Sequence, residues 1–201
     1  MQIEEKIKRA YEESIRVKEQ FFKENISLIR EVAELIAKTL NEGGKILIFG
    51  NGGSATDASH IAAEFVNRFK RERPGLPAIA LNTDMAVLTA IANDYDYSEV
   101  FAKQIKALGQ NGDVAIGIST SGASRNVIKA VEVAKKRGLK TIAFTSKKGE
   151  KLISKVDYAF AVSSEETPRI QEAHITLGHI LCELVEDILF EIPVAKKKIK
   201  Q

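Results

Sequence analysis

Hydrophobic and polar positions follow a helical period from the first residues to about residue 43. Apolar residues recur there every three or four positions, which predicts amphipathic helices, at Ile3, Ile7, Ala10, Tyr11, Ile29, Val32, Ala33, Ile36 and Leu40. No Gly or Pro occurs between residues 2 and 42. We expect two helices here, with a break near Asn25. Their apolar stripes need a cover, either the rest of the chain or another subunit.

From residue 44 the period changes, and short apolar runs alternate with helical segments. Strands are expected at 45–50, 78–81, 113–119, 140–145 and 158–162. Helices are expected at 54–69, 84–93, 98–108, 124–137 and 168–190. Strands that are apolar throughout and alternate with helices are typical of a parallel sheet covered on both faces. The sequence therefore predicts an α/β three-layer sandwich with a five-stranded parallel sheet, preceded by an N-terminal helical pair.

This pattern divides the chain into N-terminal helices for oligomerisation (1–43), the sandwich domain (44–192) and a basic C-terminal tail (193–201). The net charge is +3, and the ending "AKKKIKQ" contains four lysines and no acid. Without those lysines the chain has 26 basic and 27 acidic residues, a balance of −1. A nearly neutral body does not favour a nucleic-acid partner.

Composition narrows the class of protein further. Hydrophobic residues make up 44% of the chain, which is enough for a sizeable core. No apolar run approaches the ~20 residues that a membrane-spanning helix needs. Cys182 is the single cysteine, so no internal disulfide can form. Because the polar first residues do not resemble a signal peptide, we expect a cytoplasmic protein.

Three of the expected strands end in polar segments that are candidates for a binding site. These segments are "NGGS" (51–54), "NTD" (82–84) and "STSGASRN" (119–126). Ligands of open parallel sheets bind beyond the carboxyl ends of the strands, so the three segments should share one rim. We call this edge the rim below.

The third segment favours a phosphate ester, because its hydroxyl groups crowd the start of a helix. Free N–H groups and the positive end of the helix dipole attract anions there, and the four hydroxyl groups belong to Ser119, Thr120, Ser121 and Ser124. The alternative is an ordinary capped helix with Ser121 or Ser124 as N-cap, which requires only one hydroxyl. The segment lacks both the Walker pattern and the dinucleotide-binding glycine pattern.

His60 and Glu64 stand four residues apart, and so share one face of a helix that is otherwise apolar. Three interpretations remain open: a structural hydrogen bond, a metal-binding pair, or an acid–base group. The last helix adds three polar positions, Gln171, His174 and His179. We expect its acidic residues Glu183, Glu186 and Asp187 to form a solvated face, and Cys182 to be a small core residue.

Four stretches together resemble the phosphoheptose isomerases, a family of sugar isomerase (SIS) domains. They are "FGNGGSATDASHIAAEF", "LPAIALNTDMAVLTAIANDY", "GDVAIGISTSGASRNVIKA" and "RIQEAHITLGHI". The likeness covers nearly the whole chain. It implies the five-stranded sandwich (SIS fold), a homotetramer and active sites at subunit interfaces.

The resemblance also implies a reaction. An aldose–ketose isomerase of this family converts sedoheptulose 7-phosphate to D-glycero-D-manno-heptose 7-phosphate through an enediol intermediate. This is the first step towards ADP-heptose and the lipopolysaccharide core. A base moves a proton between C1 and C2, and an acid–base group shuttles the oxygen-bound protons.

Roles carry over to the matching positions of this chain. The resemblance implies substrate contacts from Asn51, Gly52, Gly53, Ser54, Glu64, Asn93, Asp94 and Gln171. It implies a phosphate site at Ser119, Thr120, Ser121 and Ser124. It implies one zinc ion per subunit, held by His60, Glu64, Gln171 and His179, and an acid–base pair of Glu64 and His179.

Two positions complicate this transfer. Gln171 and His179 are eight residues apart, about 12 Å along a straight helix, whereas zinc ligands lie ~2 Å from the metal. We therefore expect that a neighbouring subunit supplies one of them, or that one is not a ligand. Pro168 stands where many relatives have an Asp, so any polar role there is unfilled. His174 matches no family role, and we expect it at the surface or an interface.

A binding protein of the same fold is the competing class. A similar SIS-fold protein binds the bacterial replication initiator instead of turning over a sugar, and shares the "RERPGLPAIALNTD" and "IANDY" stretches. Such a binding protein has no need of Glu64, His179 and Ser121 together. Because this chain has all three, the isomerase is the favoured hypothesis.

Overall fold

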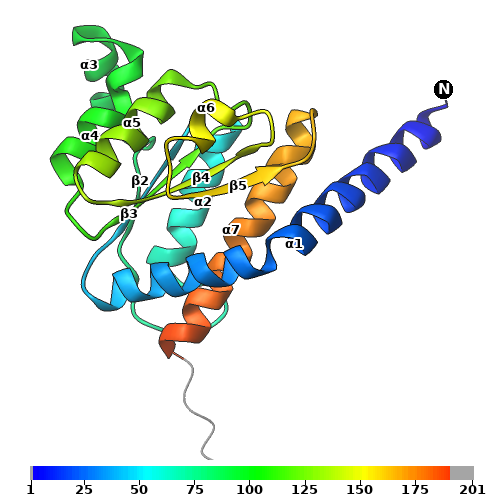
Figure 1. The fold of residues 1–201 in the computed structure, drawn as a ribbon, viewed down its shortest axis with the longest axis horizontal. Helices are drawn as coiled ribbons and strands as arrows, with labels where there is room; N and C mark the ends of the chain where they lie inside the picture. The colour runs from blue at the N-terminus through cyan, green and yellow to red at the C-terminus, as the bar shows by residue number, and fades with distance from the viewer. Residues whose placement is uncertain (1, 191–201) are drawn as a thin grey trace, which may run out of the picture.

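The computed structural model describes residues 2–190, which form a three-layer α/β sandwich around one parallel sheet (Figure 1). The five strands are β1 (Ile46–Gly50), β2 (Ala78–Ala80), β3 (Val114–Ile118), β4 (Lys140–Ser146) and β5 (Tyr158–Val162). They pair in the order β2-β1-β3-β4-β5, and every pairing is parallel. The predicted fold class is confirmed.

Alternate residues of each strand face the two helical layers, as the two-residue period of a strand requires. In β1, Ile46 and Ile48 pack under α1 (Ile3–Asn41), α2 (Gly53–Val66) and α7 (Thr167–Phe190). Leu47 and Phe49 pack under the opposite layer, formed by α4 (Val100–Leu108), α5 (Arg125–Lys136) and the short α6 (Glu150–Ile153). The chain also forms α3 (Met85–Asp94) and the 3₁₀ turn η1 (Tyr97–Glu99) between β2 and α4.

The expected break near Asn25 is wrong, because α1 is one continuous helix of 39 residues. The Asn25 side chain donates a hydrogen bond to the carbonyl of Phe21, 2.7 Å away. An Asn within a helix is tolerated when its side chain bonds to the preceding turn. From Val17 onwards α1 packs on the body, and its first turns project away from it (Figure 1).

The second half of α1 belongs to the same hydrophobic core as the sheet. Phe21 packs edge-on against Phe160 of β5, with ring centroids 6.5 Å apart, and both side chains are buried. The division at residue 43 stays a prediction. The predicted basic tail (193–201) lies outside the described residues. Within residues 2–190, no helix is long and apolar enough to cross a bilayer.

Candidate functional site

The strand order places the end of β1 beside the end of β3. The chain leaves β1 in one direction to form β2, whereas β3 pairs on the other side of β1, with Gly50 opposite Ile118. Ligands of doubly covered parallel sheets bind at such a switch point. Asn51 and Ser119 directly follow these two strand ends, so the first and third polar segments meet at the rim.

Asn51 and Asn126 form a reciprocal amide pair across this switch point. Each side-chain nitrogen donates to the other side-chain oxygen at 2.9 Å. The Tyr97 hydroxyl donates to the same Asn51 oxygen at 3.1 Å. Sequence reasoning had not assigned a role to Asn126 or Tyr97. Asn126 could have been found, because it is the last residue of the Ser-rich segment. No sequence pattern around Tyr97 indicates a place at the rim.

The hydroxyl groups of the Ser-rich segment face one another instead of capping α5. Ser124 occupies the N-cap position, yet its side chain makes no capping bond and lies 3.0 Å from the Ser119 hydroxyl. Ser121 accepts a hydrogen bond from the Ala123 backbone N–H at 3.2 Å. Ser124 therefore stands at the N-cap position that the capped-helix alternative predicted, but its hydroxyl does not cap the helix.

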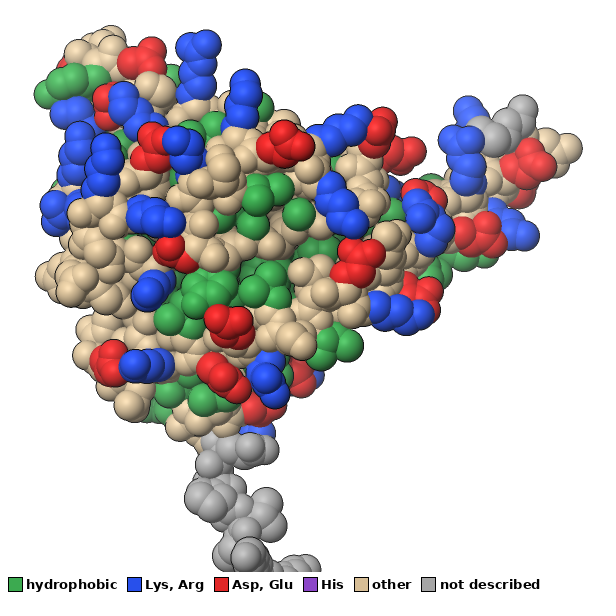
Figure 2. All heavy atoms as spheres, viewed as in Figure 1, with side chains coloured by type: hydrophobic (Ala, Val, Ile, Leu, Met, Phe, Trp, Pro, Cys, Tyr) green, Lys and Arg blue, Asp and Glu red, His purple; other side chains and the backbone are tan. Residues whose placement is uncertain are grey.

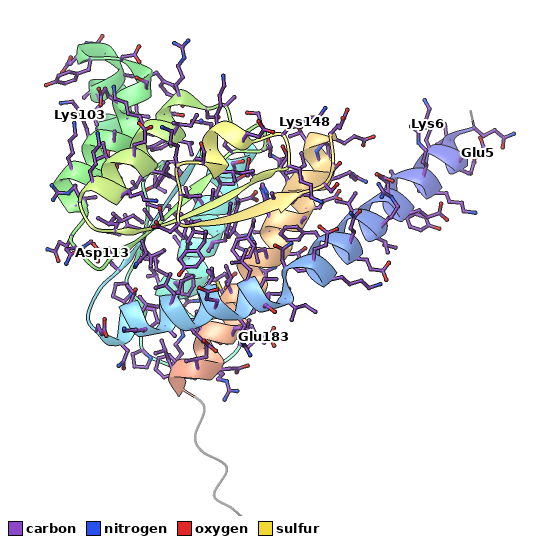
Figure 3. All side chains as sticks on the ribbon, viewed as in Figure 1. Glu5, Lys6, Lys103, Asp113, Lys148 and Glu183 are labelled. Carbon is purple, nitrogen blue, oxygen red and sulfur yellow. The ribbon has the colours of Figure 1, made fainter. Side chains whose placement is uncertain are left out.

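Thr120 and Ser121 line a hollow of about 370 Å³ at the rim, opposite the first turn of α7. Lys148 and Glu165 also line it, and they form an ion pair of 2.5 Å. Lys148 follows β4, whereas Asp113 precedes β3 at the opposite end of the sheet, as Figure 3 shows. The hollow thus combines hydroxyl groups with a cation that is paired with a carboxylate, and its hydroxyl groups can donate to an anionic ligand.

Two glycines shape the rim because their neighbours leave no room for a side chain. Gly122 has a φ of 62°, and a Cβ there would collide with the backbone of Gly149. Gly53 packs against the Gln171 amide, so that a Cβ would collide with its nitrogen. Gln171 therefore lies at the beginning of α2, beside the "NGGS" segment.

His60, Glu64 and His179 come together between α2 and α7. The His60 Nε2 lies 3.1 Å from Glu64 Oε1 and 3.4 Å from the Nε2 of His179. The three ligand atoms all lie within 4.8 Å of one another. The His60 side chain is 48% exposed and that of Glu64 26% exposed, so the cluster is open to solvent. Two imidazoles and a carboxylate converging in this way can hold a divalent metal ion.

Gln171 does not share this position within one chain. It lies against Gly53, whereas the cluster lies at His60, seven residues and about 10 Å further along α2. Of Gln171 and His179, it is His179 that lies with His60 and Glu64 in one cluster. The expectation that a neighbouring subunit supplies Gln171 or His179, or that one of the two is not a ligand, stays a prediction.

The remaining predicted contacts are spread over the rim. Ser54 is buried at the start of α2. Gly52 precedes it with a φ of 55° and open space around its Cα. Asn93 and Asp94 end α3, are exposed, and hydrogen-bond to one another at 3.0 Å. Helix α3 has no buried residue, although most of its side chains are apolar.

Two expectations about α7 are wrong. His174 is not at the surface: it is fully buried, and its Nε2 donates to the Thr145 carbonyl at 3.1 Å. Burial lowers the pKa of His174 to about 4, although the Thr145 bond opposes this shift. Glu186 is also buried, because it pairs with Arg73. Cys182 is a core residue, as expected.

Asp57 is a further acid near the cluster, three residues before His60. One of its carboxylate oxygens is buried without a hydrogen-bond partner among the described residues. Desolvation raises the pKa of Asp57, and the nearby His60 opposes that shift. Sequence reasoning gave this residue no role.

Comparison with known proteins identifies similar chains over the full length. The SIS domain family model matches residues 10–146. The phosphoheptose isomerase of Thermodesulfovibrio yellowstonii is 89% identical over 201 residues, all of both chains. That of Aquifex aeolicus is 54% identical over 187 residues, 93% of this chain and 98% of the relative.

Two solved structures that are similar to this chain are also phosphoheptose isomerases. The phosphoheptose isomerase of Neisseria gonorrhoeae superposes with a TM-score of 0.87 at 43% identity, and covers 92% of this chain and 100% of its own. That of Francisella tularensis gives a TM-score of 0.90 at 38% identity, over 93% and 100% of the two chains.

Proposed function

Because the chain belongs to the phosphoheptose isomerases of the SIS domain family, it is an aldose–ketose isomerase, and we propose how its rim performs the reaction. The substrate is sedoheptulose 7-phosphate and the product is D-glycero-D-manno-heptose 7-phosphate, in the route to ADP-heptose and lipopolysaccharide core. The observation that carries the proposal is the convergence of His60, Glu64 and His179 on one point.

The phosphate group binds to the Ser-rich segment. Four hydroxyl groups, on Ser119, Thr120, Ser121 and Ser124, lie at the beginning of α5. The helix dipole and the hydroxyl groups, which can donate hydrogen bonds, stabilise a dianion there. Asn51, Gly52, Gly53 and Ser54 face the sugar from the end of β1, with Asn93 and Asp94 on the side of α3. The heptose chain then extends from the phosphate towards the reacting carbons.

Glu64 acts as the base and His179 as the acid–base group. In the ketose-to-aldose direction, the Glu64 carboxylate removes a proton from C1 and leaves a cis-enediol. Glu64 returns the same proton to C2. His179 donates a proton to the C2 oxygen and then accepts the proton of the C1 hydroxyl. Imidazole suits this shuttle because it exchanges protons near neutral pH.

The cluster fits a zinc ion. Bonds of ~2.0–2.1 Å to tetrahedral zinc place neighbouring ligand atoms about 3.3 Å apart, and the two nearest separations in the cluster are 3.1 and 3.4 Å. His60, Glu64 and His179 would each hold the ion through one atom, with Gln171 of a neighbouring subunit as the fourth expected ligand. The second carboxylate oxygen of Glu64 and the second ring nitrogen of His179 would then remain for proton transfer. When bound, zinc polarises the substrate's carbonyl oxygen and stabilises the negative charge that develops on it.

We further infer a cytoplasmic homotetramer, as the resemblance to the family implies. The projecting part of α1 exposes an apolar stripe, with Ile3, Ile7, Tyr11 and Ile15 between 52% and 73% exposed. Figure 2 shows more hydrophobic side chains over α1 and the adjoining β5. A stripe this long needs a partner helix. Packing of α1 against other copies would bring rims of different subunits together at the interfaces. We expect neither a nucleic acid nor a membrane as partner.

The test is to incubate the purified protein with sedoheptulose 7-phosphate and to follow the sugar phosphates by NMR, with and without a chelator. Appearance of the aldoheptose phosphate, reduced by the chelator and restored by Zn²⁺, supports the whole proposal. Turnover that ignores the chelator removes the metal from the mechanism. No turnover with Zn²⁺ present contradicts the substrate assignment, and binding to the replication initiator would then be measured.

A further inference from the structure

The segment that follows α2 is fastened to α7 by one buried carboxylate. Glu186 accepts hydrogen bonds from the backbone N–H groups of Phe69, Lys70 and Arg71 at 2.8, 2.9 and 3.1 Å. Burial alone would raise the pKa of Glu186, but these three bonds and the bond from Arg73 lower it overall. The carboxylate therefore stays charged and bonded at neutral pH.

Arg73 joins this carboxylate to the end of α2. Its Nε donates to Glu186 at 2.9 Å, and the two side chains are only 1% and 2% exposed. Its two terminal nitrogens donate to the backbone carbonyls of Phe65 at 2.6 Å and Glu64 at 2.9 Å. The guanidinium thus bonds to carbonyls that have no partner within the helix at its end, and one of them belongs to Glu64, the residue that we assign as the base.

The fastened segment also touches His179. The Phe69 ring stacks on the His179 imidazole, with centroids 5.5 Å apart and an interplanar angle of 28°. Glu186 fixes the backbone N–H of Phe69 itself. One buried pair therefore bonds to the Glu64 carbonyl on α2 and to the backbone N–H of Phe69, whose ring packs on His179 of α7.

We propose that the Arg73–Glu186 pair is the positioning unit of the His60/Glu64/His179 cluster, which sets the register of α2 against α7. This inference rests on the function proposed above. Buried ion pairs contribute little net stability compared with apolar residues of similar size. Side chains behind a metal or catalytic group, in contrast, orient it, and their loss typically costs about 10–100-fold in metal affinity or activity. The pair matters for geometry more than for stability.

The matched control is the exposed ion pair beside it. Arg71 and Asp187 join the same segment to the next residue of α7 at 2.6 Å, with side chains 43% and 38% exposed. Asp187→Asn removes one charge at the same helix end, as Glu186→Gln does. The bonds to Glu64 and Phe69 belong to Arg73 and Glu186, and this variant leaves them in place. Glu183, one turn earlier on α7, is also exposed (Figure 3).

Three variants separate positioning from folding. Arg73→Lys keeps the charge but loses the fork that reaches the two α2 carbonyls. Glu186→Gln keeps the shape but loses the carboxylate. The double variant R73M/E186Q removes both charges and leaves an amide oxygen for the backbone N–H groups, so it remains available if a single variant fails to fold. Thermal unfolding is recorded for each.

Zn²⁺ affinity is measured by competition with a chromophoric chelator, and kcat and KM are measured for each folded variant. We expect about a 10–100-fold loss of Zn²⁺ affinity and of kcat, with KM nearly unchanged. A second readout needs neither metal nor activity. The chain has three histidines, so ¹³C-labelled histidine reports the His179 ring by NMR in the metal-free protein. We expect its ring-current shift from Phe69 to be lost in the variants and kept in Asp187→Asn.

Two results would overturn the proposal. One is that the folded variants bind Zn²⁺ and keep the His179 resonance as the wild type does, even if they melt earlier. The other is that Asp187→Asn matches their losses. The proposed function fails separately, through a wild-type protein that does not turn over sedoheptulose 7-phosphate. In that case Zn²⁺ affinity and the His179 resonance still decide whether the pair positions the cluster.

Discussion

The Nε2 atoms of His60 and His179 lie 3.4 Å apart, although 119 positions separate the two residues in the chain. The same His60 nitrogen also lies 3.1 Å from the Glu64 carboxylate. One ring nitrogen can make a single good hydrogen bond, so it cannot satisfy both neighbours as a donor. A cation between the three ligand atoms satisfies all of them together. The geometry is thus compatible with three ligands of one cation, as proposed above.

Glu64→Gln tests the assignment of the base. The amide keeps the size of the side chain but cannot remove the carbon-bound proton. We expect kcat for sedoheptulose 7-phosphate to fall by about 10²–10⁴-fold, with a smaller change in KM. Glu132→Gln is the control, because Glu132 lies on α5 and pairs with Lys155 at the surface, away from the cluster. Equal kcat values for the two variants would remove Glu64 from the chemistry.

Ser121→Ala and Ser124→Ala test the phosphate site. A hydrogen bond to a charged group contributes about 1.5–3 kcal/mol, so each variant should raise KM by roughly 10–100-fold and change kcat little. Inorganic phosphate should inhibit these variants correspondingly less. Ser154→Ala is the matched control, because the Ser154 hydroxyl donates to the Lys151 carbonyl on α6 and does not belong to the rim. An unchanged KM in both rim variants would place the phosphate elsewhere.

The sequence was sufficient for the sheet and for much of the rim. The five strands are apolar throughout because both faces are covered, so each run is easily recognised. The spacing of His60 and Glu64 predicts a shared helix face directly. In contrast, the expected break in α1 was wrong because Asn25 satisfies its side chain within its own helix. A polar residue in a helical pattern does not by itself reveal whether it interrupts the helix.

Burial of polar side chains was the part that the sequence could not reveal. The local pattern predicts that Glu186 is a solvated acid. Its burial is favourable because Arg73, which lies 113 residues earlier in the chain, bonds to it. His174 is buried because the Thr145 carbonyl lies within reach at the end of β4. Neither partner is visible in the local pattern around α7. Such pairs depend on the packing of helices that are distant in sequence.

The stripe on α1 is expected to hold subunits together. The double variant I7E/Y11E places two charges on the exposed apolar face of the projecting helix. We expect light scattering to show a species smaller than four times the 22.1-kDa chain, with the helix content retained. Activity should fall in parallel if rims meet at the interfaces. Lys8→Gln changes the neighbouring polar face and serves as control. A tetrameric double variant would contradict the assignment of the interface.

His174 should make the stability of the protein depend on pH. Its pKa is about 4 in the folded chain because of burial, against an ordinary value of ~6.5 in the unfolded chain. The unfolded state therefore binds a proton that the folded state refuses between these two values. The free energy of unfolding should fall as the pH drops from about 6.5 to 4, by a total on the order of 3 kcal/mol, and this contribution should be constant below pH 4.

His174→Gln isolates that contribution, because an amide can still donate to the Thr145 carbonyl but does not titrate. Urea unfolding of the metal-free proteins at pH 7, 5.5 and 4.5, at one protein concentration, gives the difference between wild type and variant. We expect the variant to be less stable than the wild type at pH 7 and to lose less stability on acidification. Parallel pH profiles for wild type and His174→Gln would mean that His174 accepts its proton without unfolding, and that its burial imposes no penalty on the charged ring.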